Sequence, residues 1–179
     1  LVINMIYEYS IFENIEKDYG VIARGMAYPY GTYDDKVIEL LEKCGICYSR
    51  TVNSTENFKL PENWLTLHPT CHHKNPRLME LAKSFAEEKL SHFTETRMFY
   101  LWGHSYEFDN DDNWNVIEEF AEYIGGREDI WYATNIEIYD YIMAQRALHI
   151  SANEDIIHNP SAIEVWFEKD GKVYLMCND

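Results

Sequence analysis

The sequence predicts an α/β fold with a parallel sheet, followed by an antiparallel β appendage. Through the first four-fifths of the chain, short strand-like segments alternate with amphipathic helical segments, a pattern typical of β-α units with right-handed crossovers. Residues 98–103 (MFYLWG) are almost continuously apolar, as expected of a strand buried on both faces. Near the end, alternating apolar and polar residues surround Asp170-Gly171, a strong signal for a type I′ hairpin. We therefore expect an α/β domain at residues 1–146 and a β-hairpin appendage at residues 147–179.

The predicted strands are short apolar segments bounded by glycine, proline or polar residues. They comprise residues 21–29, 46–52, 63–69, 98–103 and 129–134. In a parallel sheet, the residues at the carboxyl ends of the strands point toward the ligand site. By this rule the candidates for function are the residues at strand ends: Tyr28 to Tyr30, His68, His104 and Thr134.

Helices are predicted between these strands from apolar residues at helical spacing. Met5, Tyr9 and Phe12 follow i, i+4, i+7 spacing and predict a first helix that ends at Gly20. The later helices are expected to begin at Thr32 to Asp35, at Asn75-Pro76, at Trp114 and at Thr134.

The charge of the chain excludes two classes of partner. The formal net charge is −16, from 31 acidic and 15 basic residues. Such a surface repels phosphate backbones and anionic lipid, so we expect neither nucleic acid nor a membrane as a partner. No apolar run reaches the roughly 18 to 20 residues of a membrane span, and no signal peptide is recognised. Localisation is left open, with the cytoplasm expected in the absence of a targeting signal.

Four cysteines are too few for a disulfide scaffold. Cys44 and Cys47 have the C-x-x-C spacing of redox proteins. A redox thiolate needs the N-terminus of a helix, whereas Cys44 follows helix-forming residues and Gly45 has the character of a helix cap. We therefore interpret both cysteines as packing residues.

His104 follows a buried strand and a glycine, so its ring is expected to emerge at the edge of the sheet. Histidine suits proton transfer near neutral pH, which makes His104 a candidate acid or base; a hydrogen bond within the loop is the alternative. The acidic run that follows does not fit an EF-hand, because Trp114 and Phe120 stand where glycine and glutamate are required. Asp111 and Asp112 are expected to cap the next helix instead.

Two further motifs are candidates for a site. In residues 24–31 (RGMAYPYG), Arg24 on a buried strand requires a carboxylate partner, and the Pro-Tyr-Gly turn presents backbone N–H groups; a structural ion pair and a tight turn are the alternative. In residues 67–75 (LHPTCHHKN), His68 and His72 have H-x-x-x-H spacing. On a strand the two residues lie about 13 Å apart and cannot share a metal ion, whereas on a tight turn they can.

With these motifs in this order, the chain resembles the polysaccharide deacetylase family (NodB-homology domain, carbohydrate esterase family 4). RGMAYPYG is similar to the family's third motif and YLWGHS to its fifth. The resemblance covers residues 1–146 and implies a partial (β/α) barrel. It also implies a hydrolase that removes N-acetyl or other acyl groups from a carbohydrate with a divalent metal, usually zinc. Five strands cannot close a barrel, so self-association over the open sheet edge is a further expectation.

The resemblance implies roles for five residues. Arg24 matches the arginine that tethers the aspartate base, and His104 matches the histidine that protonates the departing amine. Tyr30 matches the residue whose backbone N–H binds the oxyanion, and Leu101 and Trp102 match the wall of the acetyl pocket. Together such groups would form a site for acyl transfer.

The chain departs from the family pattern before Arg24. The family's first motif supplies two aspartates and its second an H-x-x-x-H metal pair, and neither stands between Leu1 and Arg24. His68 and His72 follow the arginine motif, so the metal role is not carried over to them, and they stay candidates on spacing alone. Because this chain lacks these base and metal ligands, we expect it to have no deacetylase activity when it is alone. The alternative is a non-catalytic carbohydrate-binding or scaffold remnant.

Overall fold

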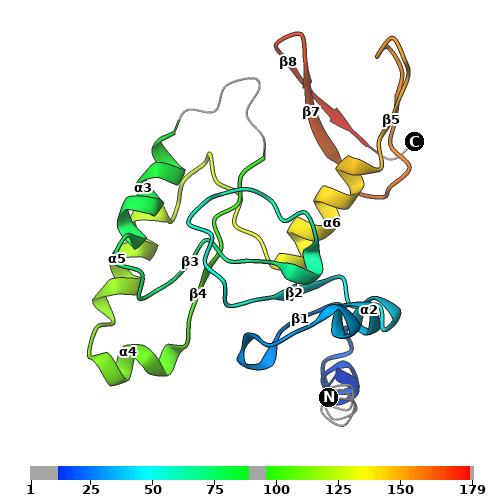
Figure 1. The fold of residues 1–179 in the computed structure, drawn as a ribbon. Helices are drawn as coiled ribbons and strands as arrows, with labels where there is room; N and C mark the ends of the chain where they lie inside the picture. Colours follow the sequence, from blue (N-terminus) through cyan, green and yellow to red (C-terminus); the bar gives the residue numbers. More distant parts are fainter. Residues whose placement is uncertain (1–11, 89–95, 178–179) are drawn as a thin grey trace.

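Two pairs of short parallel strands lie at the centre of the molecule, between the helices (Figure 1). The structure is a computed structural model and describes residues 12–88 and 96–177. The strands pair as β1 (Gly25–Ala27) with β2 (Tyr48–Arg50), and as β3 (Cys71–His72) with β4 (Leu101–Trp102). A parallel bridge between Arg50 and Leu67 joins β2 to the segment that precedes β3, and the two pairs remain separate two-stranded sheets. These strands follow the pattern expected of β-α units.

The register of β3 and β4 places the histidine-rich segment beside His104. Cys71 lies opposite Leu101, and His72 lies opposite Trp102. The pairing continues one residue further, because the backbone N–H of His73 donates to the carbonyl of Trp102 at 2.9 Å. Since the carboxyl ends of parallel strands meet at one edge, the residues after His72 and Trp102 emerge side by side.

Helices connect and flank the paired strands. They are a helix through residues 12–19, α2 (Asp35–Lys43), α3 (Leu78–Glu87), α4 (Ser105–Asp111), α5 (Asn115–Ile124) and α6 (Asn135–Arg146). Figure 1 shows α3 and α5 together beside β3 and β4. The sequence predicted all of these helices except α4, from apolar spacing or, for α6, from the capping-box spacing of Thr134 and Glu137. Among the described residues, no helix combines the length and the apolar character needed to cross a membrane.

Three of the predicted helix ends are confirmed. The first helix stops at Gly20, whose φ of +67° suits glycine; Met5 and Tyr9, which predicted its start, lie outside the described residues. Cys44 caps α2, and Gly45 follows it with φ +78°. At the start of α6, the backbone N–H of Thr134 donates to the Glu137 carboxylate at 2.7 Å, as the capping-box spacing predicted.

Two capping predictions are wrong. The N-cap of α2 is Asp34 rather than Thr32, and its side chain accepts a hydrogen bond from the backbone N–H of Val37 at 2.9 Å. Neither Asp111 nor Asp112 caps α5. Asp112 instead ends the unpredicted α4 in a left-handed conformation, with φ 48°.

Two predicted strands are also wrong. Residues 63–69 contain a 3₁₀ helix, η2 (Trp64–Thr66), in which the Asn63 side chain accepts from the backbone N–H of Leu65 at 2.8 Å, and only Leu67 makes a strand-like bridge, to Arg50. Residues 129–134 contain no strand. The Tyr132 hydroxyl donates to the carbonyl of Ile124 at 2.5 Å and holds this segment against the end of α5.

Antiparallel hairpins form the carboxyl-terminal part of the chain. β7 (Val165–Lys169) and β8 (Lys172–Met176) pair around Asp170 and Gly171, whose φ values of 52° and 73° are both positive, as a type I′ turn requires. This prediction is confirmed. A second, short pair joins β5 (His149–Ile150) to β6 (Ile157–His158).

Candidate functional site

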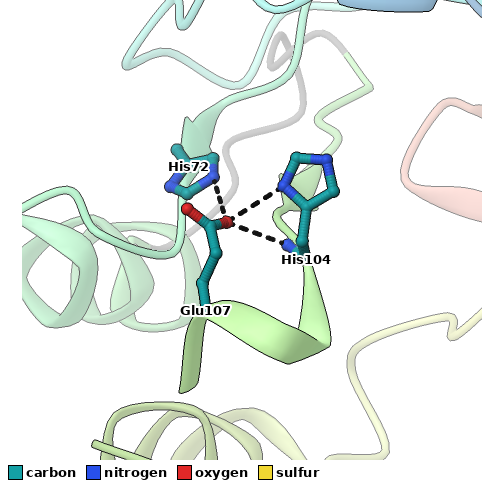
Figure 2. Close-up of side chains that lie close together, drawn as sticks. All are labelled: His72, His104 and Glu107. Atoms are coloured by element: carbon teal, nitrogen blue, oxygen red, sulfur yellow. Dashed lines mark hydrogen bonds and ion pairs between the residues drawn. The ribbon is translucent and has the colours of Figure 1, made fainter. Parts of the chain in front are cut away.

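A group of imidazole and carboxylate side chains lies at the carboxyl edge of β3 and β4 (Figure 2). His72 ends β3, His104 follows β4, and Glu107 lies in the first turn of α4. Figure 2 shows the Glu107 carboxylate between the two rings. Its Oε2 atom lies 3.2 Å from Nε2 of His72 and 3.0 Å from Nδ1 of His104. Two strand ends and the start of a helix therefore converge on one carboxylate oxygen.

The start of α4 fixes the position of Glu107. His104 is the N-cap of this helix, and its backbone N–H donates to Oε2 of Glu107 at 3.2 Å. A carboxylate in the first turn also interacts favourably with the helix dipole. The same three-residue spacing that begins the helix thus brings the carboxylate back to the His104 ring.

Neighbouring groups hold Glu107 in its ionised form. Burial raises the pKa of this carboxyl, but hydrogen bonds from the His104 ring, from Lys74 and from the His104 backbone outweigh burial and lower the pKa to about 2. The Lys74 ammonium lies 3.1 Å from Oε1 of Glu107 and 2.7 Å from Asp111. Lysine therefore occupies one carboxylate oxygen, and the histidines share the other.

The contacts of the two rings define where their protons lie. The backbone N–H of Lys74 donates to Nδ1 of His72 at 3.2 Å, so a neutral His72 carries its proton on Nε2, facing Glu107. An ionised Glu107 can only accept, so Nδ1 of His104 carries a proton as well. Because the His104 side chain is 47% exposed, its Nε2 atom remains open to solvent.

His73 lies behind this group and is buried without a hydrogen-bond partner. Its side chain is 2% exposed, and neither ring nitrogen has a partner. Nε2 lies 3.9 Å from Oε2 of Glu107, while the ring packs against Phe108 with centroids 4.2 Å apart. Burial lowers the pKa of His73, so its ring is held neutral. The fit requires Gly103, because a Cβ there would lie 1.8 Å from Nδ1 of His73.

The two predicted pocket-wall residues face different surroundings. Trp102 lies edge-on to the His72 ring with centroids 4.5 Å apart, and the Arg50 guanidinium lies 4.3 Å from its ring centroid. Leu101 instead packs with the buried core around Cys71 and lines an apolar cavity of about 850 Å³. The structure therefore places only Trp102 beside the histidines.

Arg24 has the carboxylate partner that the sequence required. Its two terminal nitrogens each lie 2.8 Å from an oxygen of Asp140, which belongs to α6. This bidentate hydrogen bonding raises the pKa of Arg24 and ties the start of β1 to that helix. Asp140 follows Arg24 by 116 positions, so the pair joins distant parts of the chain.

Tyr30 and His68 do not join the histidine–glutamate group. The Tyr30 side chain is fully exposed in the turn η1 (Pro29–Gly31), with a φ of 54°. Nδ1 of His68 lies 2.5 Å from the Thr51 hydroxyl, next to β2. Among the described residues, the H-x-x-x-H pair therefore divides: His72 belongs to the group, and His68 does not.

The group fits the donor requirements of a zinc-class metal ion. Two imidazole nitrogens and one carboxylate oxygen lie within 4.8 Å of one another. With metal–ligand bonds of about 2.0–2.1 Å, tetrahedral ligand atoms lie roughly 3.3 Å apart. The separations of 3.0 and 3.2 Å from Glu107 to the two rings are close to this value. His72, His104 and Glu107 are thus the residues that would hold the metal implied by the resemblance.

Sequence reasoning missed Glu107, His73 and Asp140. Glu107 had a signal, since it stands three residues after His104 in the spacing of a helix start. His73 is next to a recognised candidate, but its burial depends on how β3 and β4 pair. Asp140 had no signal, because its contact with Arg24 spans most of the chain.

Comparison of the chain with known protein families, with curated proteins and with solved structures finds no match.

Proposed function

We propose that the chain is a hydrolase acting on acyl groups of a carbohydrate, with His104 as the residue that moves the proton. The observation that carries this proposal is the contact between His104 and Glu107. One carboxylate oxygen accepts from both the ring and the backbone of His104, which orients the imidazole and leaves Nε2 toward solvent. This is the arrangement of a histidine general base supported by a carboxylate.

The chemistry follows from the two ring nitrogens. Nε2 accepts a proton from the attacking water, while the hydrogen bond from Nδ1–H to Glu107 stabilises the positive charge that forms on the ring. The same Nε2–H then donates the proton to the departing oxygen or nitrogen. Glu107 can do this at neutral pH because its pKa of about 2 keeps it ionised.

A neutral carbohydrate suits the surroundings of His104. The acidic surface disfavours anionic substrates, whereas aromatic side chains offer flat apolar faces to sugar rings. Tyr106 is 58% exposed, and its ring centroid lies 5.2 Å from that of His104. The ring centroid of Trp102 lies 5.7 Å from that of His104.

The two kinds of acyl group make different demands. An aryl ester needs only a general base, because its leaving group departs without a proton. An N-acetyl amide needs a stronger nucleophile, and a divalent metal at His72, His104 and Glu107 would supply activated water when bound. We therefore expect the chain to hydrolyse an activated ester in chelator without releasing acetate from chito-oligosaccharides.

The test is hydrolysis of 4-nitrophenyl acetate in excess EDTA. His104→Ala is expected to lower the rate by about 100-fold or more, and Glu107→Gln to lower it by a smaller factor. His149→Ala is the matched control, because it removes an exposed imidazole from β5. Equal rates for His104→Ala and His149→Ala would overturn the proposal, since surface imidazoles would then account for the hydrolysis.

A second candidate function is carbohydrate binding without turnover. Exposed aromatic side chains favour it, since Trp131 and Tyr132 are 58% and 52% exposed in addition to Tyr106. Calorimetric titration with a chito-oligosaccharide separates the two functions. The binding function would be supported if His104→Ala still binds the oligosaccharide and if the unchanged chain hydrolyses the ester no faster than His104→Ala.

A further inference from the structure

We propose that His72, His104 and Glu107 bind a zinc-class divalent cation, beside the buried ring of His73. The site differs from the H-x-x-x-H pair that the sequence suggested, because it combines the ends of two neighbouring strands with the first turn of α4. Binding does not require that the proposed hydrolase activity exists, so the two proposals can fail separately.

The first support is the geometry of the three donors. Nε2 of His72 and Nδ1 of His104 both face the same oxygen of Glu107, at 3.2 and 3.0 Å. These are the spacings of ligand atoms around one ion, and two imidazoles with one carboxylate suit zinc better than calcium or magnesium.

The second, independent support is His73. Burying a polar ring with no partner on either nitrogen costs free energy, and such groups are rare in folded proteins. Its side chain is 98% buried, and its Nε2 atom points to within 3.9 Å of Oε2 of Glu107. A cation at that oxygen would lie near this otherwise unpartnered ring, although His73 itself is outside the three donors that lie within 4.8 Å of one another.

Lys74, paired with Asp111, leaves one oxygen of the Glu107 carboxylate for the cation. The Lys74 ammonium contacts Oε1 of Glu107 and is itself paired with Asp111. Oε2 is therefore the oxygen left for the cation. Paired with Asp111, the lysine also contributes little net positive charge beside the site.

Cation binding and the acid–base role exclude each other. Both use Nδ1 of His104, which would exchange its proton for the metal. His72 would likewise give up the proton on Nε2. The loaded and the metal-free forms are therefore two chemical states of one site.

The test is titration of the tag-free chain with zinc chloride, followed by calorimetry in a large excess of magnesium. Magnesium occupies exposed carboxylates without competing well for imidazole. The expected result is one zinc ion per chain, with affinity at least about 100-fold weaker in His72→Ala and in Glu107→Gln, and about tenfold weaker in His73→Phe. His149→Ala and His68→Gln should bind as the unchanged chain does.

Two results would overturn the proposal: no zinc binding in excess magnesium, or binding retained in the His72→Ala, Glu107→Gln double variant. A measurement on the unchanged chain covers the case in which a variant does not fold. In nitrogen-15 spectra, zinc should shift the ring signals of His72 and His104 and leave that of His149 in place. The reverse pattern would also overturn the proposal.

Discussion

Replacement of Glu107 by glutamine gives the sharpest test of the site, because it removes a charge and keeps the shape of the side chain. In the folded chain this carboxylate accepts from the His104 ring and backbone and faces the Lys74 ammonium. These contacts lower its pKa from 4.5 to about 2, although the side chain is only 16% exposed. That difference corresponds to roughly 3 kcal/mol of folding free energy at neutral pH.

The direction of the pH effect follows from the lowered pKa. The stabilisation is fully present above pH 4.5, where the carboxyl is ionised in both the folded and the unfolded chain. It is lost as the pH falls toward 2, because the unfolded chain binds the proton first. Glu107→Gln is therefore expected to cost about 1 to 3 kcal/mol at pH 7, since its amide oxygen still accepts hydrogen bonds.

Urea unfolding of both chains at about pH 7, 4 and 3 measures this effect. Across the acid range the unchanged chain should lose up to about 1.4 kcal/mol per pH unit more than Glu107→Gln. Glu118→Gln, on an exposed face of α5, is the control and should match the unchanged chain. Equal acid sensitivity of Glu107→Gln and the unchanged chain would refute the contacts inferred for this carboxylate.

Three other changes test the surroundings of the site. Burial lowers the pKa values of His72 and His73 below 6.5, so the stability that depends on their neutral rings is full above pH 6.5 and is lost as the pH falls through the folded pKa values. In urea unfolding, the free energy of His73→Phe should therefore depend less on pH below 6.5 than that of the unchanged chain, and an equal dependence would contradict this. Gly103→Ala places a Cβ 1.8 Å from the His73 ring and should cost about 1–3 kcal/mol in thermal unfolding, whereas an unchanged midpoint would rule out this packing. Arg24→Lys cannot donate to both oxygens of Asp140, and a double-mutant cycle with Asp140→Asn should show a coupling of about 1 kcal/mol; a coupling of zero would leave the pair without a structural role.

Local features of the sequence predicted local features of the structure well. The type I′ turn at Asp170-Gly171 and the capping box at Thr134 depend on a few adjacent residues, so their residue types were sufficient. The strand predicted at residues 63–69 is wrong because a local turn there outweighs the apolar pattern. There, the Asn63 side chain accepts from the backbone N–H of Leu65 and the Asn63 carbonyl accepts from that of Thr66, which closes a 3₁₀ turn, although Trp64 and Leu65 are as apolar as a strand requires.

The candidate site depends on the pairing of strands, which spacing along the chain does not contain. His68 and His72 stand four positions apart, yet His68 contacts Thr51 near β2, and His72 joins His104, which lies 32 positions further on. The deciding feature is the register of β3 and β4, which sets His72 opposite Trp102. A shift of this register by one residue would turn His72 to the other face of the sheet and remove it from Glu107. In parallel sheets, histidines that end neighbouring strands are therefore stronger candidates for one site than histidines that are close in sequence.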